Sequence, residues 1–144
     1  MITAVDTNVL LDVFGADPDF GQRSAEALRT CLREGRLVAC EVVWAETASF
    51  FPSHAAAQEA MERLAVGFSP LDVKAALMAS GAWRKHRAEG GRRERVAADF
   101  LIGAHAQAHA DRLLTRDRGF YRSCFSGLKV LDPAAKAKPS PRKP

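Results

Sequence analysis

The chain opens with a short apolar run that ends in polar residues, Met1-Ile2-Thr3-Ala4-Val5-Asp6-Thr7-Asn8-Val9-Leu10-Leu11-Asp12. Residues 2–5 suit a buried β-strand, and residues 9–11 begin a helix for which Asp6, Thr7 and Asn8 are all suitable N-caps. Open α/β sheets bind ligands at the edge where the carboxyl ends of their strands meet. We therefore expect Asp6 to lie at such an edge, as the first of several carboxylates around a divalent metal ion.

Composition and charge indicate a globular domain without a broadly cationic surface. The 144 residues are 47% hydrophobic and 26% charged, which is ordinary for one globular domain. The net charge is +4, but four of the 21 basic residues lie in the last nine positions, which leaves 17 basic against 17 acidic residues. This balance argues against a nucleic-acid-binding surface over the whole body and leaves room for a local basic patch.

The apolar runs and the cysteines favour a cytoplasmic protein. No apolar run approaches the roughly 20 residues of a membrane span, and the N-terminal run is too short for a signal peptide. Cys31, Cys40 and Cys124 cannot all pair and show no CxxC spacing. We expect reduced thiols in the core rather than a disulfide or a zinc site.

Helix and strand patterns alternate along the chain. We expect helices at 24–34, 41–51, 54–66, 71–89 and 96–110, with Pro70 in the first turn of the fourth. Short strands are expected at 37–40, around Phe68, at 112–115 and at 128–131. Strand, helix and strand with short links form a parallel βαβ unit, so the pattern predicts an α/β fold. We expect one domain over residues 1–133 and a disordered, Pro- and Lys-rich tail over 134–144.

Three further acids are predicted to lie near Asp6. Glu46 belongs to one helical stripe (residues 42, 43, 46, 49 and 50) that is otherwise mostly apolar, where a lone acid is costly unless it is paired or binds a cation. Asp99 lies in the first turn of a strongly apolar helix, where the helix dipole favours an acid. Asp117 follows the strand at 112–115, as Asp6 follows the first strand. A compact parallel sheet could bring all four acids to one cleft.

Several anionic groups in one cleft repel each other unless they hold a cation. Carboxylate oxygens indicate a hard ion, Mg²⁺ or Mn²⁺, rather than zinc. Such a site can bind a phosphate oxygen, activate a water molecule and stabilise a leaving oxygen. The four acids therefore predict phosphodiester hydrolysis.

Two other groups of polar residues have simpler interpretations. We expect Asp12 to be a solvated residue of the first helix rather than a metal ligand. His105 and His109 are four positions apart, which is metal-ligand spacing. The glutamate of an HExxH motif is missing between them, so we do not expect a metal ion there.

One dense basic stretch surrounds Gly90 and Gly91. Guanidinium groups suit phosphate binding, and an exposed tryptophan can stack on a base. A solvated helix end and loop would have the same composition, so both interpretations stay open. The candidates for nucleic-acid contact are Trp83, Arg84, Arg87, Arg92 and Arg93.

At these motifs the chain resembles the PIN-domain ribonucleases, in particular the VapC-type toxins of bacterial toxin–antitoxin pairs. The matching pieces are Val-Asp-Thr-Asn-Val-Leu-Leu at 5–11, Trp-Ala-Glu-Thr at 44–47, Ala-Ala-Asp-Phe-Leu-Ile-Gly-Ala-His-Ala at 97–106 and Leu-Leu-Thr-Arg-Asp-Arg-Gly-Phe at 113–120. Each piece alone is a weak signal, but the four in order extend over nearly the whole chain except its tail.

The resemblance implies a three-layer α/β/α sandwich with a parallel sheet of four or five strands. It also implies RNA cleavage that depends on Mg²⁺ or Mn²⁺, with transfer RNA or ribosomal RNA as substrate. By the same resemblance, the metal-binding acids would be Asp6, Glu46, Asp99 and Asp117, and the supporting polar residues Thr7, Asn8 and Thr115. Similar proteins form homodimers and are silenced by a cognate VapB-type antitoxin.

Other classes of protein fit these motifs less well. Haloacid-dehalogenase-type phosphatases need an acid two residues after the first one, where this chain has Asn8. Response-regulator receivers need a pair of adjacent acids near the first strand and a lysine after a late strand, and this chain has neither. The remaining alternative is a PIN-like module that binds RNA or a protein and cleaves little.

Overall fold

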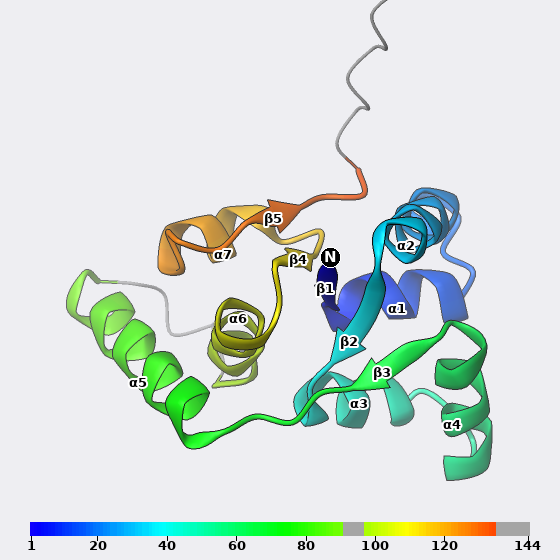
Figure 1. Cartoon of the computed structure of the whole chain (residues 1–144), viewed down its shortest axis with the longest axis horizontal. Coiled ribbons are helices and arrows are strands. Elements are labelled where there is room, and N and C mark those ends of the chain that lie inside the picture. The colour runs from blue at the N-terminus through cyan, green and yellow to red at the C-terminus, as the bar shows by residue number, and fades with distance from the viewer. Residues whose placement is uncertain (91–96, 135–144) are drawn as a thin grey trace, which may run out of the picture.

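A computed structural model describes residues 1–90 and 97–134. Five strands form one sheet in which every pairing is parallel, with the order β3-β2-β1-β4-β5. The strands are β1 (Ile2–Val5), β2 (Arg36–Ala39), β3 (Val66–Phe68), β4 (Arg112–Leu114) and β5 (Val130–Leu131). β1 is central because both β2 and β4 pair with it. Figure 1 shows helices on both sides of the strands, which confirms the predicted three-layer α/β/α architecture with five strands.

The helices on one side of the sheet come from the first half of the chain. α1 (Thr7–Phe14), α2 (Gly21–Glu34) and α4 (His54–Arg63) lie on this side, and α3 (Glu41–Ala48) follows β2 directly. Asp6 is the N-cap of α1, since its side chain accepts a hydrogen bond from the Thr7 backbone N–H. The first strand and the first helix therefore meet at Asp6.

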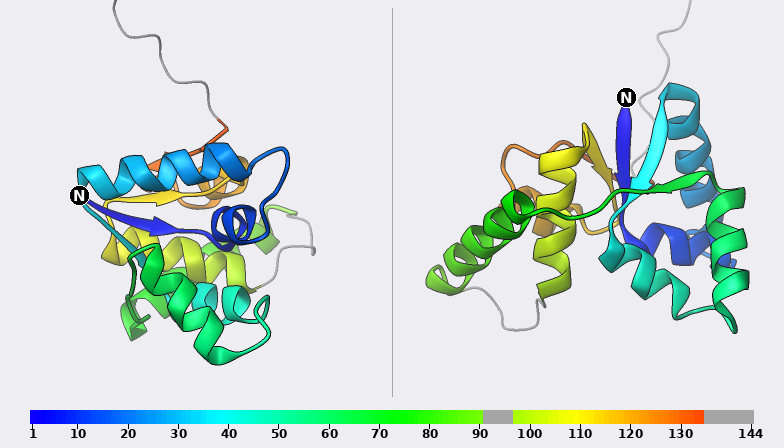
Figure 2. Two further views of the ribbon diagram at one scale, coloured as in Figure 1. Left: turned by 90° about the vertical axis from the view of Figure 1, so that its right-hand side faces the viewer. Right: turned by 60° about the horizontal axis from the view of Figure 1, so that its bottom comes forward.

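The helices on the other side of the sheet come from the second half. They are α5 (Val73–Ala88), α6 (Ala97–His109) and α7 (Arg118–Cys124). α5 and α6 pack against each other, as the right-hand view of Figure 2 shows. α5 begins later than predicted, because Asp72 is its N-cap, so Pro70 lies before the helix rather than in its first turn. α7 was not predicted at all, and α2 begins at Gly21 rather than at residue 24.

The core lies between the sheet and these two helix layers. Val5, Leu113 and Leu114 of the central strands are at most 1% exposed, as are Leu10 of α1 and Phe100 of α6. The three cysteines form no disulfide, as predicted, and Cys31 and Cys40 are buried. The predicted tail beyond residue 134 lies outside the described residues. Within residues 1–90 and 97–134, no helix is both long enough and apolar enough to cross a membrane.

Gly103 allows α6 to pack closely against the ring of Phe125. A Cβ atom at position 103 would overlap this ring, and Phe125 is itself buried. We predict that Gly103→Ala lowers the free energy of unfolding by about 1–3 kcal/mol, the usual cost of overpacking a core. Urea denaturation measures this change.

Gly81→Ala is the matched control, because residue 81 is also helical and a Cβ there meets nothing within 4 Å. Alanine should raise the free energy of unfolding at this position by about 0.5–1 kcal/mol through its better helix propensity. Equal effects at both positions would contradict the packing that we describe for Gly103.

Candidate metal-binding active site

Asp6 is a buried carboxylate at the carboxyl end of the central strand. Its side chain belongs to a residue that is only 6% exposed. Oδ1 accepts a hydrogen bond of 2.8 Å from the Thr7 N–H, and Oδ2 accepts one of 2.7 Å from the Thr115 hydroxyl. The Asn8 amide nitrogen lies 3.5 Å from the same Oδ2 atom. The three predicted supporting residues therefore all surround the Asp6 carboxylate.

The pKa of Asp6 is raised from 3.8 to about 6, chiefly because burial disfavours the charged form. Hydrogen bonds from Thr115, Thr7 and Tyr121 lower the pKa, and the negative charge of Asp99 raises it. Asp99 is therefore close enough to Asp6 for the two charges to repel each other. Asp99 lies in the first turn of α6, as predicted from the sequence.

Asp117 lies beside the same carboxylate through Thr115. Its backbone N–H donates a hydrogen bond of 3.0 Å to the Thr115 hydroxyl oxygen. That hydroxyl in turn donates a hydrogen bond to Asp6. The loop after β4 therefore carries one residue that orients Asp6 and, two positions later, a further acid.

Tyr121 is a residue of this site that the sequence reasoning missed. It belongs to α7 and is fully buried. Burial raises the pKa of its hydroxyl, and the charges of Asp6, Asp99 and Asp117 raise it further. The hydroxyl is inaccessible to water, and its interaction with Asp6 lowers the pKa of that carboxylate. In the sequence, the signal for Tyr121 would have been its position four residues after Asp117. This spacing points to the site only if α7 is predicted as a helix.

Glu46 reaches the site by a different route from the one predicted. Its residue is exposed, and the buried positions of α3 are Val43 and Thr47. The expectation that Glu46 occupies an apolar stripe was therefore wrong, because the helix buries the neighbouring face. Glu46 Oε1 instead accepts a hydrogen bond of 2.9 Å from the Thr7 hydroxyl. Thr7 thus links Glu46 to Asp6, because its hydroxyl binds Glu46 and its backbone N–H binds Asp6.

The donor atoms fit a hard divalent cation that keeps part of its water shell. Within the described residues, no group of three or more Asp, Glu, His or Cys side chains forms a metal site by itself. Mg²⁺ commonly binds one or two carboxylates and fills its other positions with water and phosphate oxygens. A cation beside Asp6 would offset both the burial of this carboxylate and its repulsion by Asp99. The buried Tyr121 hydroxyl adjoins the same place through its interaction with Asp6.

The model of the PIN domain family matches residues 3–126. The chain belongs to the PIN domain family. The match extends from β1 through α7 and includes all four predicted acids. A comparison with curated protein sequences gives no match.

Several solved structures share this fold, among them chains of VapBC complexes. A chain of VapBC2 from Rickettsia felis, bound to a DNA fragment from their promoter, has 18% identity and a TM-score of 0.73, covering 92% of this chain and 98% of that one. VapBC-1 from nontypeable Haemophilus influenzae has 21% identity and a TM-score of 0.72, with coverage of 94% and 100%. FitAcB from Neisseria gonorrhoeae has 23% identity and a TM-score of 0.65, with coverage of 92% and 98%. These similarities show the PIN fold.

Asp12 was wrongly predicted to be a solvated residue of α1. It is 4% exposed and forms an ion pair with Arg116, with Nε to Oδ2 at 2.7 Å and Nη2 to Oδ1 at 3.0 Å. The Ser24 hydroxyl donates to the same Oδ2 atom at 2.8 Å. Asp12 is thus a buried residue with a structural partner, next to the loop that carries Asp117.

The two histidines of α6 have hydrogen-bonding and ionic partners away from the PIN-domain acids. His105 Nε2 lies 2.9 Å from the Ser69 hydroxyl, and His109 Nε2 lies 3.0 Å from Asp72 Oδ2. Burial lowers the pKa of His105. Neither histidine belongs to a metal-binding group within the described residues, and their contacts supply a structural reason for both.

The predicted nucleic-acid contacts divide between α5 and a segment outside the described residues. Trp83, Arg84 and Arg87 are exposed residues of α5, whereas Arg92 and Arg93 fall in 91–96, which the structure does not describe. Trp83 stacks on Phe100, with ring centroids 5.7 Å apart and an angle of 12° between the planes. The Arg87 guanidinium lies 5.5 Å from the centroid of the Trp83 ring.

The raised pKa of Asp6 predicts a specific pH dependence of stability in the metal-free protein. The folded state holds its proton up to about pH 6, whereas the unfolded chain loses it near pH 3.8. The folded state therefore binds more protons between these values, and its stabilisation by this group is lost as the pH rises. The expected loss is up to about 3 kcal/mol between pH 4 and pH 7.

Asp6→Asn removes this titration with little change in volume. Urea denaturation in the presence of a chelator, at pH 4, 5, 6 and 7, compares the two proteins. The difference in stability between Asp6→Asn and the parent should grow in favour of Asp6→Asn across this range. Parallel pH profiles would show that Asp6 is not buried as a protonated group.

Proposed function

We propose that this PIN domain is a metal-dependent ribonuclease that hydrolyses RNA phosphodiester bonds. The observation that supports this most is the buried Asp6 carboxylate, whose pKa is raised in part by the neighbouring charge of Asp99. A protein that only needed stability would gain from replacing such a carboxylate with a neutral group. A buried carboxylate is instead expected in a site that binds Mg²⁺ or Mn²⁺, because the carboxylate is a ligand of the ion.

The chain's own residues would hold and orient the components of this reaction. Asp6, Asp99 and Asp117 would bind the cation, with Glu46 beside them through Thr7. A bound divalent ion stabilises charge on a phosphate oxygen and lowers the pKa of a coordinated water molecule. The Thr115 hydroxyl fixes the orientation of Asp6, and the Tyr121 hydroxyl would donate to a water molecule or an oxygen of the filled site.

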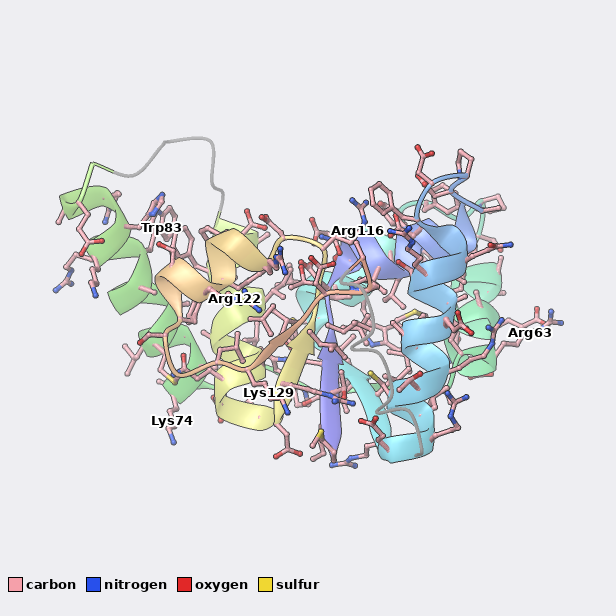
Figure 3. All side chains as sticks on the ribbon, turned by 90° about the horizontal axis from the view of Figure 1, so that it is seen from above. Arg63, Lys74, Trp83, Arg116, Arg122 and Lys129 are labelled. Atoms are coloured by element: carbon pink, nitrogen blue, oxygen red, sulfur yellow. The ribbon has the colours of Figure 1, made fainter. Side chains whose placement is uncertain are left out.

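The end of α5 is the proposed path of the RNA strand toward this site. A pocket of about 380 Å³ between α5 and α6 is lined by Trp83, Arg84 and Arg87, with Ala97 and Phe100 among the residues from α6. Ala97 and Phe100 flank Asp99 in sequence, so the pocket lies next to the helix turn that carries this acid. In the view of Figure 3, Trp83 and Arg116 both lie in the upper half of the molecule, apart from each other, and Lys74 lies in the lower half. Arg92 and Arg93 remain candidates for the same path.

The biological role that fits best is the toxin of a VapBC-type pair acting in the cytoplasm. Chains of the VapBC complexes named above share the fold over nearly their whole length. By this analogy the partner is a VapB-type antitoxin, the chain forms a homodimer, and the substrate is a structured RNA such as transfer RNA or ribosomal RNA. The alternative is a PIN-like module that binds RNA or a protein with little or no cleavage, and the following experiment distinguishes the two.

Asp99→Asn should abolish the metal-dependent cleavage of RNA and keep the fold. The amide replaces an anionic oxygen ligand at almost constant volume, and we expect a loss of about 100-fold or more. The assay is cleavage of total RNA by the purified chain with Mg²⁺ or Mn²⁺, repeated with a chelator. Asp99→Asn should also relieve the growth inhibition that we expect when the parent is expressed without an antitoxin.

Glu62→Gln is the control for a lost carboxylate, because Glu62 is an exposed residue of α4. It should cleave RNA like the parent. Cleavage by Asp99→Asn at the parent's rate would show that the site is wrongly assigned. A folded parent that cleaves no RNA with either ion would support the RNA-binding alternative.

A further inference from the structure

α1 contacts Arg116 at two points, and Arg116 lies between two residues of the proposed site. The Asn8 side-chain oxygen accepts a hydrogen bond of 3.3 Å from the Arg116 backbone N–H. Asp12, one helical turn later, binds the Arg116 guanidinium through both of its oxygens. Residues four positions apart lie on the same face of a helix, so one face of α1 fixes both the backbone and the side chain of Arg116.

The surroundings of this pair restrict the guanidinium to one position. The Ser24 hydroxyl of α2 donates to Asp12 Oδ2 at 2.8 Å. The ring of Phe20 lies 4.2 Å from the central carbon of the guanidinium, which stacks on it. Asp12 is almost fully buried, while the Arg116 side chain is 29% exposed. The pair is therefore enclosed on the protein side by α1, α2 and Phe20.

We propose that Asp12 and Arg116 are positioning residues, which hold the segment 115–117 so that Thr115 and Asp117 face Asp6. This proposal rests on the proposed function. Thr115 and Asp117 are the immediate neighbours of Arg116 in the chain, and each has its own contact in the site. β4 ends at Leu114, and the Thr115 N–H still donates a hydrogen bond of 3.0 Å to the Leu131 carbonyl of β5, so the sheet holds the backbone of Thr115 but not that of Arg116 and Asp117. The ion pair between Asp12 and Arg116 therefore holds the backbone just after the last strand hydrogen bond.

An ion pair with only a structural role should not affect metal binding when it is removed. The chain contains such a pair, which serves as a control. Arg112, at the beginning of β4, binds Glu34 Oε2 through Nη2 at 2.6 Å and is itself only 6% exposed. Like the first pair, this ion pair joins an arginine in or just after β4 to an acid of the helix layer formed by α1 and α2. It lies at the opposite end of β4, away from Asp6.

The test compares Asp12→Asn and Arg116→Lys with Glu34→Gln in the full chain. Arg116→Lys keeps the charge but loses the two-point fork of the guanidinium. Isothermal titration measures the affinity for Mn²⁺, and amide hydrogen exchange by NMR reports the Arg116 and Asp117 N–H groups. Thermal unfolding confirms that each variant is folded.

We expect both Asp12→Asn and Arg116→Lys to weaken Mn²⁺ binding by about 10-fold, the usual effect of removing a residue that orients a ligand. Exchange at Arg116 and Asp117 should become faster in both. Glu34→Gln should leave the Mn²⁺ affinity and both exchange rates at the parent's values. Unchanged Mn²⁺ affinity in both folded variants overturns the proposal, and so does an equal loss in Glu34→Gln.

Failure of the proposed function can be distinguished from failure of the positioning role. A parent chain that binds no Mn²⁺ would refute the metal site. In that case the exchange rates alone decide the inference, because faster exchange in Asp12→Asn supports the positioning role and unchanged exchange overturns it.

Discussion

The burial of a carboxylate next to like charges is the constraint on which the rest of this site depends. Asp6 follows the central strand directly and is only 6% exposed to water. Its hydrogen bonds with Thr7 and Thr115 offset only part of the cost, since the pKa of Asp6 still rises to about 6. The surrounding residues are arranged to hold this group in one orientation, which is the arrangement that a cation-binding centre needs.

The order of the strands explains how acids far apart in sequence reach the same place. β1 pairs with β4, so that the ends of both strands, with Asp6 and the loop to Asp117, are adjacent. α6 feeds β4 and starts at the same edge of the sheet, which brings Asp99 there. α3 follows β2, the other neighbour of β1, and contributes Glu46. Each acid thus comes from a different connection of one parallel sheet.

The sequence predicted those site residues whose place is determined by where a strand ends or a helix begins. Asp6 and Asp117 come after strands, and Asp99 opens a helix, so an α/β fold alone predicts their common edge. Glu46 was predicted for a wrong physical reason, because the helical stripe assigned to it is not the face that α3 buries. Asp12 could not be predicted as buried, since its partner Arg116 is 104 positions away and only the folded chain brings the two together.

Tyr121 illustrates a second limit of sequence reasoning. A seven-residue helix that contains Gly119 and Ser123 has too little periodicity to be recognised. Once α7 was missed, the buried hydroxyl next to Asp6 could not be placed. The polar residues at strand ends could be predicted, whereas a residue contributed by a short helix such as α7 could not.

Thr115 has a further consequence for how substitutions in this domain combine. Its hydroxyl donates its one hydrogen bond to Asp6, accepts one from the Asp117 N–H and lies 3.5 Å from the Asn8 amide nitrogen. All the hydrogen-bonding capacity of a hydroxyl is used, so serine is the one replacement that keeps every contact. Substitutions at Asp6, Asn8 and the Asp117 loop all act on this one oxygen, and their effects will not add independently. The evolutionary paths open to these positions are therefore coupled through a single atom.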